Sequence, residues 1–191
     1  MVYLRKLLLG LWNIWFYIIS GATLLLVFPF LLLCLTREKW YTGVFYAARN
    51  FWSPLIMLGM GFIPVIKHNV DLDYSKQYMF VANHVSMIDI MMSFMAIRKP
   101  AVFVGKMELD RLPFFATIYK RAAILVNRDS ISSRKNVYIQ AKRKLELGFN
   151  MVIYPEGLGP EPEVFLAPCK NGAFRIAVKH QIPIVPITLP D

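Results

Sequence analysis

The chain has 191 residues, the size of one domain, and 57% of them are apolar, against ~45–50% in an average soluble domain. Its 22 Lys and Arg outnumber 12 Asp and Glu, and the net charge of +10 suits anionic lipid head groups or a phosphorylated partner. The basic residues are spread along the chain and do not line one recognition helix, so nucleic acid is not an expected partner.

Cysteine and histidine are sparse and widely spaced. The two cysteines, Cys34 and Cys169, form no CxxC pair, so no disulfide framework is expected and a reducing, cytoplasm-facing environment fits. The three histidines lie too far apart for an HExxH or zinc-finger pattern. We therefore expect neither a metal site nor a bound cofactor.

A long apolar segment begins the chain. Residues 7–35 carry no charge, and as one helix they would measure about 43 Å against a hydrocarbon core of ~30 Å. A second apolar stretch, residues 41–66, is interrupted by Pro54 and Pro64, which is typical of a helix lying in the membrane interface. We expect residues 1–62 to form a membrane-embedded helical hairpin in one leaflet, with a true membrane span as the alternative. A cleaved signal peptide fits less well, because the apolar run continues well beyond a usual signal sequence.

After residue 66 the pattern changes to short apolar runs that alternate with amphipathic segments, as in successive strands and helices. The clearest amphipathic segment, residues 132–147, predicts a helix with one apolar face and with Lys and Arg around the other. We expect residues 63–191 to be an α/β domain with a mixed, largely parallel sheet flanked by helices. Five short runs are its predicted strands: residues 78–81, 101–104, 124–126, 151–154 and 184–187.

The most informative stretch is NHVSMID at residues 83–89, which follows a predicted strand and precedes a Met-rich run with helical character. A histidine general base needs a fixed tautomer, and a carboxylate bonded to its second ring nitrogen supplies one and stabilises the imidazolium. His84 and Asp89 can meet in this way across a turn. The bare H-x4-D spacing also occurs by chance, so a purely structural histidine stays an alternative. The sequence has no G-x-S-x-G, Walker or G-x-G-x-x-G motif to favour a serine hydrolase, nucleotide hydrolase or dinucleotide-binding protein.

In context, this stretch resembles the N-H-x-S-x-x-D block of the glycerolipid acyltransferase family, whose members include the 1-acylglycerol-3-phosphate acyltransferases. Four ordered blocks are far more specific than any one of them, and an apolar N-terminus is expected of such an enzyme. The second, third and fourth blocks are VNR at residues 126–128, YPEG at 154–157 and IPIVPI at 182–187, and GKMEL at 105–109 is similar to the stretch that family members carry between the first and second blocks.

The resemblance implies roles for residues in the first two blocks and in the stretch between them. His84 would deprotonate the acceptor hydroxyl, Asp89 would hold His84, and the alkoxide would attack the thioester of acyl carrier protein or of coenzyme A. Lys106 and Arg128 are the candidates for binding the acceptor phosphate, since an arginine fork and a lysine charge suit a phosphate. A solvated surface pair is the alternative for these two residues.

The third and fourth blocks are expected to complete the site. Glu156 either bonds acceptor hydroxyls or only braces the site, and Gly157 permits a tight turn where substrate comes close. Residues 182–187 would form a strand that floors the site, through packing or through binding.

The third block departs from the family pattern. Family members commonly carry threonine and a basic residue after the glycine, whereas this chain has Leu158 and Gly159. One expected phosphate ligand is therefore missing, and Lys170 or Arg175 is a candidate to replace it. Because of this difference, the sequence does not specify the head group of the acceptor.

The expected protein is a monotopic enzyme at the cytoplasmic face of the bacterial inner membrane, which acylates the sn-2 hydroxyl of lysophosphatidic acid to give phosphatidic acid. Its expected partners are the bilayer, the lysophospholipid, and acyl carrier protein or a coenzyme A thioester. An acyltransferase with another lysolipid or an aminolipid as acceptor, and a catalytically silent membrane scaffold, are the alternatives. Because the chain ends at Asp191, directly after the fourth block, it is expected to be a truncated or a shortened family member.

Overall fold

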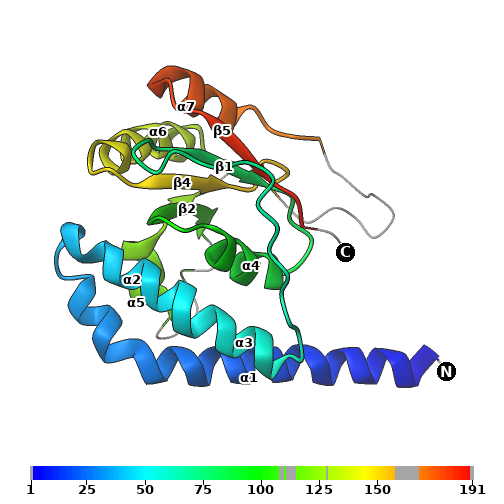
Figure 1. The fold of residues 1–191 in the computed structure, drawn as a ribbon. Helices are drawn as coiled ribbons and strands as arrows, with labels where there is room; N and C mark the ends of the chain where they lie inside the picture. Colours follow the sequence, from blue (N-terminus) through cyan, green and yellow to red (C-terminus); the bar gives the residue numbers. More distant parts are fainter. Residues whose placement is uncertain (1, 108–109, 111–114, 128, 158–167, 190–191) are drawn as a thin grey trace.

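The computed structural model describes residues 2–107, 110, 115–127, 129–157 and 168–189. Figure 1 shows an N-terminal helical hairpin packed below a central sheet, with two further helices above the sheet. The chain order is therefore a hairpin followed by strands and helices in alternation, as the apolar pattern predicts.

The first arm of the hairpin is α1 (Val2–Cys34), a single helix of 33 residues that would measure about 50 Å if straight. Pro29 lies inside it, where the ring removes one backbone hydrogen bond and favours a bend. In Figure 1 the last part of α1 turns away from the line of the rest. Over Tyr3–Cys34 the helix is long and apolar enough to cross a membrane, and most of its side chains are exposed.

The second arm runs back along α1, which confirms the predicted hairpin. It begins after Cys34, and the close approach of Gly43 to the Cys34 side chain lets the arms meet near the turn. Further along, the indole of Trp52 donates to the Ser20 carbonyl at 3.2 Å, and that of Trp15 donates to the Gly59 carbonyl at 2.9 Å. The second arm consists of η1 (Glu38–Trp40), α2 (Tyr41–Ala47), η2 (Ala48–Trp52) and α3 (Ser53–Gly59).

The sheet has five strands in the order β3-β2-β4-β1-β5, and all four pairings are parallel. Each predicted strand is confirmed, with ends that differ by at most two residues. The strands are nearly continuous apolar runs because a parallel sheet is covered on both faces. They are β1 (Met79–Ala82), β2 (Ala101–Lys106), β3 (Ile124–Val126), β4 (Asn150–Ile153) and β5 (Ile184–Ile187).

Helices cover both faces of this sheet. Figure 1 shows α6 and α7 on one face, and α4, α5 and the hairpin on the other. The helix predicted over residues 132–147 is confirmed as α6, which begins where the Ser130 hydroxyl accepts from the Ser133 backbone N–H at 3.2 Å. The connecting helices are α4 (Ile88–Ala96), α5 (Phe115–Ala122), α6 (Ile131–Glu146) and α7 (Gly172–His180).

The hairpin and the sheet share one apolar core. Tyr41 and Phe45 of α2 are buried in the same cluster as the strands, and the Phe45 ring lies 5.7 Å from that of Phe94 in α4. The buried Tyr41 hydroxyl donates to the Ala101 carbonyl at the start of β2, at 2.9 Å. Residues 1–62 and 63–191 therefore support each other's packing, and their division into an anchor and a catalytic domain stays a prediction.

Tyr41→Phe is expected to lower the free energy of unfolding by about 1–2 kcal/mol, because the Ala101 carbonyl loses its donor in a dry environment. Urea titration of the full chain measures this change. Tyr46→Phe is the matched control, since the Tyr46 hydroxyl is exposed and its contact with the Arg98 carbonyl is 3.5 Å long. Equal effects of the two substitutions would contradict the structural role of the Tyr41 hydrogen bond.

Candidate active site

The candidate site lies at the edge of the sheet where the parallel strands end. Strand β1 pairs Val81 with Ile153 of β4, and it pairs Ala82 with Ile187 of β5. The residues that follow these three strands therefore emerge side by side at their carboxyl ends, the usual place for a site in a parallel sheet. This register brings residues that are 72 and 106 positions apart in the chain into contact, as the hydrogen bonds of His84 and Asn83 show.

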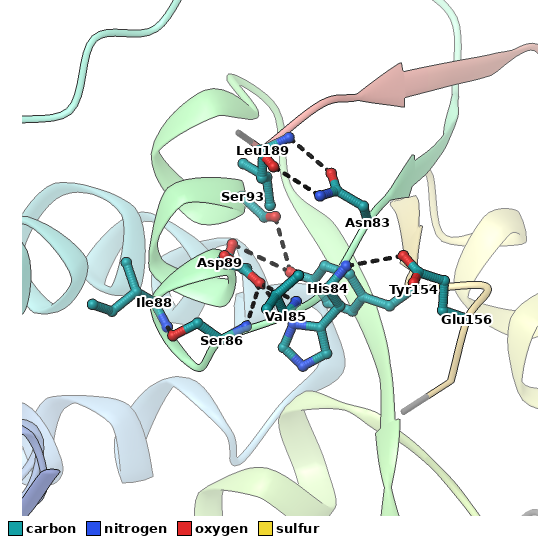
Figure 2. Close-up of polar contacts among 10 residues, drawn as sticks. All are labelled: Asn83, His84, Val85, Ser86, Ile88, Asp89, Ser93, Tyr154, Glu156 and Leu189. Atoms are coloured by element: carbon teal, nitrogen blue, oxygen red, sulfur yellow. Dashed lines mark hydrogen bonds and ion pairs between the residues drawn. The ribbon is translucent and has the colours of Figure 1, made fainter. Parts of the chain in front are cut away.

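His84 and Asp89 form a hydrogen-bonded pair across a turn. The Nδ1 atom of His84 lies 3.2 Å from Oδ2 of Asp89, and both side chains are largely buried. Figure 2 shows the pair beside the ring of Tyr154. Asp89 is the second residue of α4, and its carboxylate points back toward the loop that joins β1 to this helix. The five-residue spacing predicted from the sequence thus places the two groups in direct contact.

Asp89 is held by the loop as well as by His84. Its Oδ2 atom accepts the backbone N–H groups of Val85 and Ser86, each at 2.7 Å. Burial raises the pKa of Asp89, but the hydrogen bonds from His84, Ser86 and Val85 outweigh burial and leave this pKa below its ordinary value. The carboxyl group is therefore ionised at neutral pH and can only accept hydrogen bonds.

An ionised Asp89 decides the tautomer of His84. Because the carboxylate has no proton to donate, Nδ1 of His84 must carry the hydrogen of the 3.2 Å bond. The lone pair of the neutral imidazole is then on Nε2, the ring atom that points away from Asp89. This is the arrangement of a general base whose orientation is fixed by a carboxylate.

Tyr154 supports the pair from the adjacent strand, a contact that the sequence did not predict. Its ring lies against the imidazole of His84, with centroids 4.5 Å apart and planes 31° apart. Its hydroxyl donates to Oγ of the buried Ser93 at 2.9 Å and lies 3.4 Å from the Asp89 carbonyl. Tyr154 therefore links β4 to α4, the helix that carries Asp89.

Glu156 and Gly157 form the turn that follows β4. The buried Glu156 accepts the backbone N–H of His84 through Oε1 at 3.2 Å, so its carboxylate braces the start of the loop between β1 and α4. The Gly157 backbone N–H donates to the Tyr154 carbonyl at 3.2 Å, and its φ of 85° favours glycine at this position. The bracing role is visible in the contacts, while substrate binding by Glu156 stays a prediction.

Asn83 joins the first block to the end of the fourth. Its side-chain amide donates to the Leu189 carbonyl at 2.7 Å, and its carbonyl oxygen accepts the Leu189 backbone N–H at 2.8 Å. Figure 2 shows both bonds beside His84. Strand β5 is thereby fixed next to β1, which fits the predicted strand beneath the site. The role of Asn83 was not evident from the sequence, since its partner lies 106 residues away.

The structure places Lys106, one of the two predicted phosphate ligands, at this edge. Lys106 is the last residue of β2 and pairs with Val126 of β3, so it reaches the same carboxyl edge as His84. Arg128, Leu158 and Gly159 lie outside the described residues. Binding of phosphate by Lys106 and Arg128 therefore stays a prediction.

Lys170 lies beside the turn of the third block. Its backbone N–H donates to the Pro155 carbonyl at 2.9 Å, next to the residue that braces His84. The side chain of Lys170 is exposed, and so is that of Arg175 in α7. Of the two candidate replacements for the missing basic residue, Lys170 has the contact that places it by the site. Among the described residues, no cluster of three metal-ligating side chains occurs.

Comparison with known proteins agrees with these features. The family model described as Acyltransferase matches residues 65–190. A 1-acyl-sn-glycerol-3-phosphate acyltransferase of Helicobacter pylori is 33% identical over 115 residues, which cover 58% of this chain and 47% of that protein. One of Chlamydomonas reinhardtii is 24% identical over 187 residues, covering 97% of this chain and 55% of that protein. The chain spans about half the length of these relatives.

A solved structure is similar over nearly the whole chain. The 1-acyl-sn-glycerophosphate acyltransferase PlsC of Thermotoga maritima superposes with a TM-score of 0.71 and is 24% identical. The superposition covers 97% of this chain and 74% of that one. The two proteins therefore share a fold, which includes the N-terminal helices.

Asp89→Asn is expected to lower the free energy of unfolding by about 1–3 kcal/mol at pH 7, because an amide oxygen is a weaker acceptor than a carboxylate. Since the pKa of Asp89 is lowered by folding, its charge stabilises the protein above the ordinary pKa of 3.8. That stabilisation is lost as the pH falls through the folded-state pKa. Urea titrations of parent and variant should therefore converge as the pH falls from about 4 through the folded-state pKa of Asp89.

Asp71→Asn serves as the control for this pH series, because it makes the same change at an exposed aspartate. Its unfolding free energy should differ little from that of the parent across the range. A difference between parent and Asp89→Asn that is as large at pH 3 as at pH 7 would contradict the lowered pKa.

Proposed function

This chain belongs to the acyltransferase family, and from that premise we propose that it transfers a fatty acyl group from a thioester to the sn-2 hydroxyl of lysophosphatidic acid. The product would be phosphatidic acid. The observation that carries the proposal is the His84–Asp89 pair, because it leaves Nε2 of an oriented imidazole available to a substrate hydroxyl. The relatives named 1-acyl-sn-glycerol-3-phosphate acyltransferase support this choice of substrate.

The proposed reaction begins with the acceptor hydroxyl at Nε2 of His84. As the hydroxyl oxygen attacks the thioester carbonyl carbon, its proton moves to Nε2 and the imidazole becomes positively charged. Asp89 stabilises that charge by accepting the hydrogen bond from Nδ1. Such stabilisation contributes to the 10²–10⁴-fold rate effect that is typical of general base catalysis.

The proposed second step releases the thiol. The tetrahedral intermediate collapses, the carbon–sulfur bond breaks, and the thiolate takes the proton from Nε2. His84 returns to its neutral state with the hydrogen on Nδ1, ready for another cycle. No covalent acyl-enzyme is needed, because the histidine acts only on protons. Acyl carrier protein and coenzyme A are both suitable donors, since each presents the same thioester group.

The proposed location is the cytoplasmic face of a bacterial inner membrane, with the hairpin dipped into one leaflet. The exposed apolar side chains of α1 support it, because a face of this length and composition favours lipid over water. A relative from the bacterium Haemophilus influenzae is 26% identical over 126 residues, which is compatible with a bacterial membrane as the location. Such a position would supply the site with lipid acceptors from the same leaflet.

A second candidate is acyl transfer to another lysolipid or to an aminolipid. It is favoured by the replacement of the family's threonine and basic residue with Leu158 and Gly159. The position of Lys170 beside Pro155 argues for the phosphate-bearing acceptor, because it supplies a positive charge near the same turn. A silent scaffold is less consistent with a histidine and an aspartate held at bonding distance.

His84→Ala is expected to reduce acyl transfer to lysophosphatidic acid by about 10²–10⁴-fold, because the general base is removed. The assay uses the full chain in detergent or lipid and offers acyl carrier protein and coenzyme A thioesters in parallel. His68→Ala is the matched control, since His68 is exposed and lies outside the site, and it should retain the parent's rate. A folded parent that transfers nothing to lysophosphatidic acid with either donor would overturn the proposed substrate.

Lys170→Gln is expected to raise the KM for lysophosphatidic acid by roughly fivefold, which corresponds to about 1 kcal/mol for an exposed ionic contact. The value of kcat should change little, because Lys170 touches neither the proton nor the thioester. Lys179→Gln removes the same charge from the exposed surface of α7 and should leave the KM unchanged. An unaltered KM in Lys170→Gln would show that other residues bind the phosphate.

A further inference from the structure

A polar recess lies at the opposite end of the sheet from His84. Its volume is about 640 Å³, and it is enclosed by the hairpin turn and by the last turns of α5 and α6. Ala123, at the start of β3, contributes to the wall, so the recess is at the amino ends of the strands. We call it the basic cavity, and its charged lining residues are Arg37, Glu38, Lys120, Arg121, Arg143 and Lys144.

The basic cavity has a large excess of positive charge. Five cationic side chains face one carboxylate, which Arg143 contacts at 3.0 Å and Lys144 at 3.4 Å. The C-terminal ends of α5 and α6 contribute partial negative charge, but two helix dipoles offset only about one positive charge together. Asp110 pairs with Lys120 at 3.4 Å and offsets one more. The remaining excess of positive charge therefore favours the binding of an anion in the cavity.

Two arginines are available to bind that anion. Among the described parts of the chain, neither Arg37 nor Arg121 forms an ion pair with a carboxylate. The guanidinium of Arg37 lies over the Trp40 ring at 5.1 Å, which orders the side chain without neutralising it. Guanidinium groups bind phosphate through paired hydrogen bonds, so a phosphate is the anion that this lining suits.

The surroundings favour a lipid as the source of the phosphate. Leu35 and Tyr41 add apolar surface to the cavity wall. Leu35 directly follows α1, where Phe30 and Leu33 expose half or more of their surface near the same end. An amphiphile could thus place its charged group in the cavity and its chains along α1. Basic pockets between membrane helices bind the head groups of anionic lipids in other proteins.

We propose that the basic cavity binds the phosphate head group of an anionic phospholipid, whose acyl chains lie against the C-terminal part of α1. The inference rests on the membrane location proposed above, and it concerns a site distinct from the acyl-transfer site. A lipid bound here would hold the hairpin turn at the level of the head groups. In Figure 1 this turn lies at the left of the molecule, opposite the N-terminal end of α1, so such a lipid would fix the protein's tilt on the membrane.

Isothermal titration calorimetry with dihexanoyl phosphatidylglycerol, below its micelle concentration, tests the site on the full chain in non-ionic detergent. We expect saturable binding that Arg37→Gln/Arg121→Gln weakens at least tenfold. The control, Lys135→Gln/Lys179→Gln, also removes two positive charges, but from exposed positions on α6 and α7, and should change the Kd less than twofold. Dihexanoyl phosphatidylcholine should bind at least tenfold more weakly than the anionic lipid.

Several outcomes would overturn the proposal. No saturable binding, or equal losses in both double variants, would mean that the lipid is attracted only by the overall charge. Inorganic phosphate or coenzyme A that binds as tightly as the lipid would make a soluble phosphate the ligand. Arg121→Gln alone, which should weaken binding at least threefold, replaces the double variant if the latter melts at a lower temperature. His84→Ala should bind the lipid as the parent does, so a failure of acyl transfer leaves this test intact.

Discussion

The parallel pairing of β1 with β4 and β5 is the constraint on which the candidate site depends. It places the ends of three strands side by side, so that the backbone of His84 reaches Glu156 and the side chain of Asn83 reaches Leu189. Because side chains alternate along a strand, a slip of one residue in this register would turn these contacts to the other face. The positions of the candidate site residues therefore depend on apolar strands whose own side chains take no part in the proposed reaction.

In the loop after β1, the backbone N–H groups and the imidazole donate their hydrogen bonds to one carboxylate, that of Asp89. Asp89 accepts two backbone N–H groups besides the imidazole, which keeps it ionised and fixes the hydrogen of His84 on Nδ1. The hairpin is joined to the same sheet, since the Tyr41 hydroxyl donates to the carbonyl of the first residue of β2. A lipid held near the hairpin turn would accordingly act on the orientation of the whole molecule.

Much of the fold could be predicted from local pattern. The five strands are short apolar runs bounded by polar or turn residues, and α6 shows its apolar face at helical spacing. The hairpin followed from two apolar segments and their helix breakers, although the contacts between its arms and the single core shared with the sheet did not. Those features depend on which surfaces meet, and a one-dimensional pattern does not specify them.

The sequence by itself determined the strands, the hairpin and the pairing of His84 with Asp89, because these depend on spacing within a few residues. Only the tertiary structure decided that Tyr154 lies against His84, that Glu156 braces it, and that Arg37 and Arg121 line one cavity. The partners in these contacts are separated by about 70 to 85 residues along the chain. Their meeting is set by the order and register of strands, which arise from packing the whole core at once and not from any local preference.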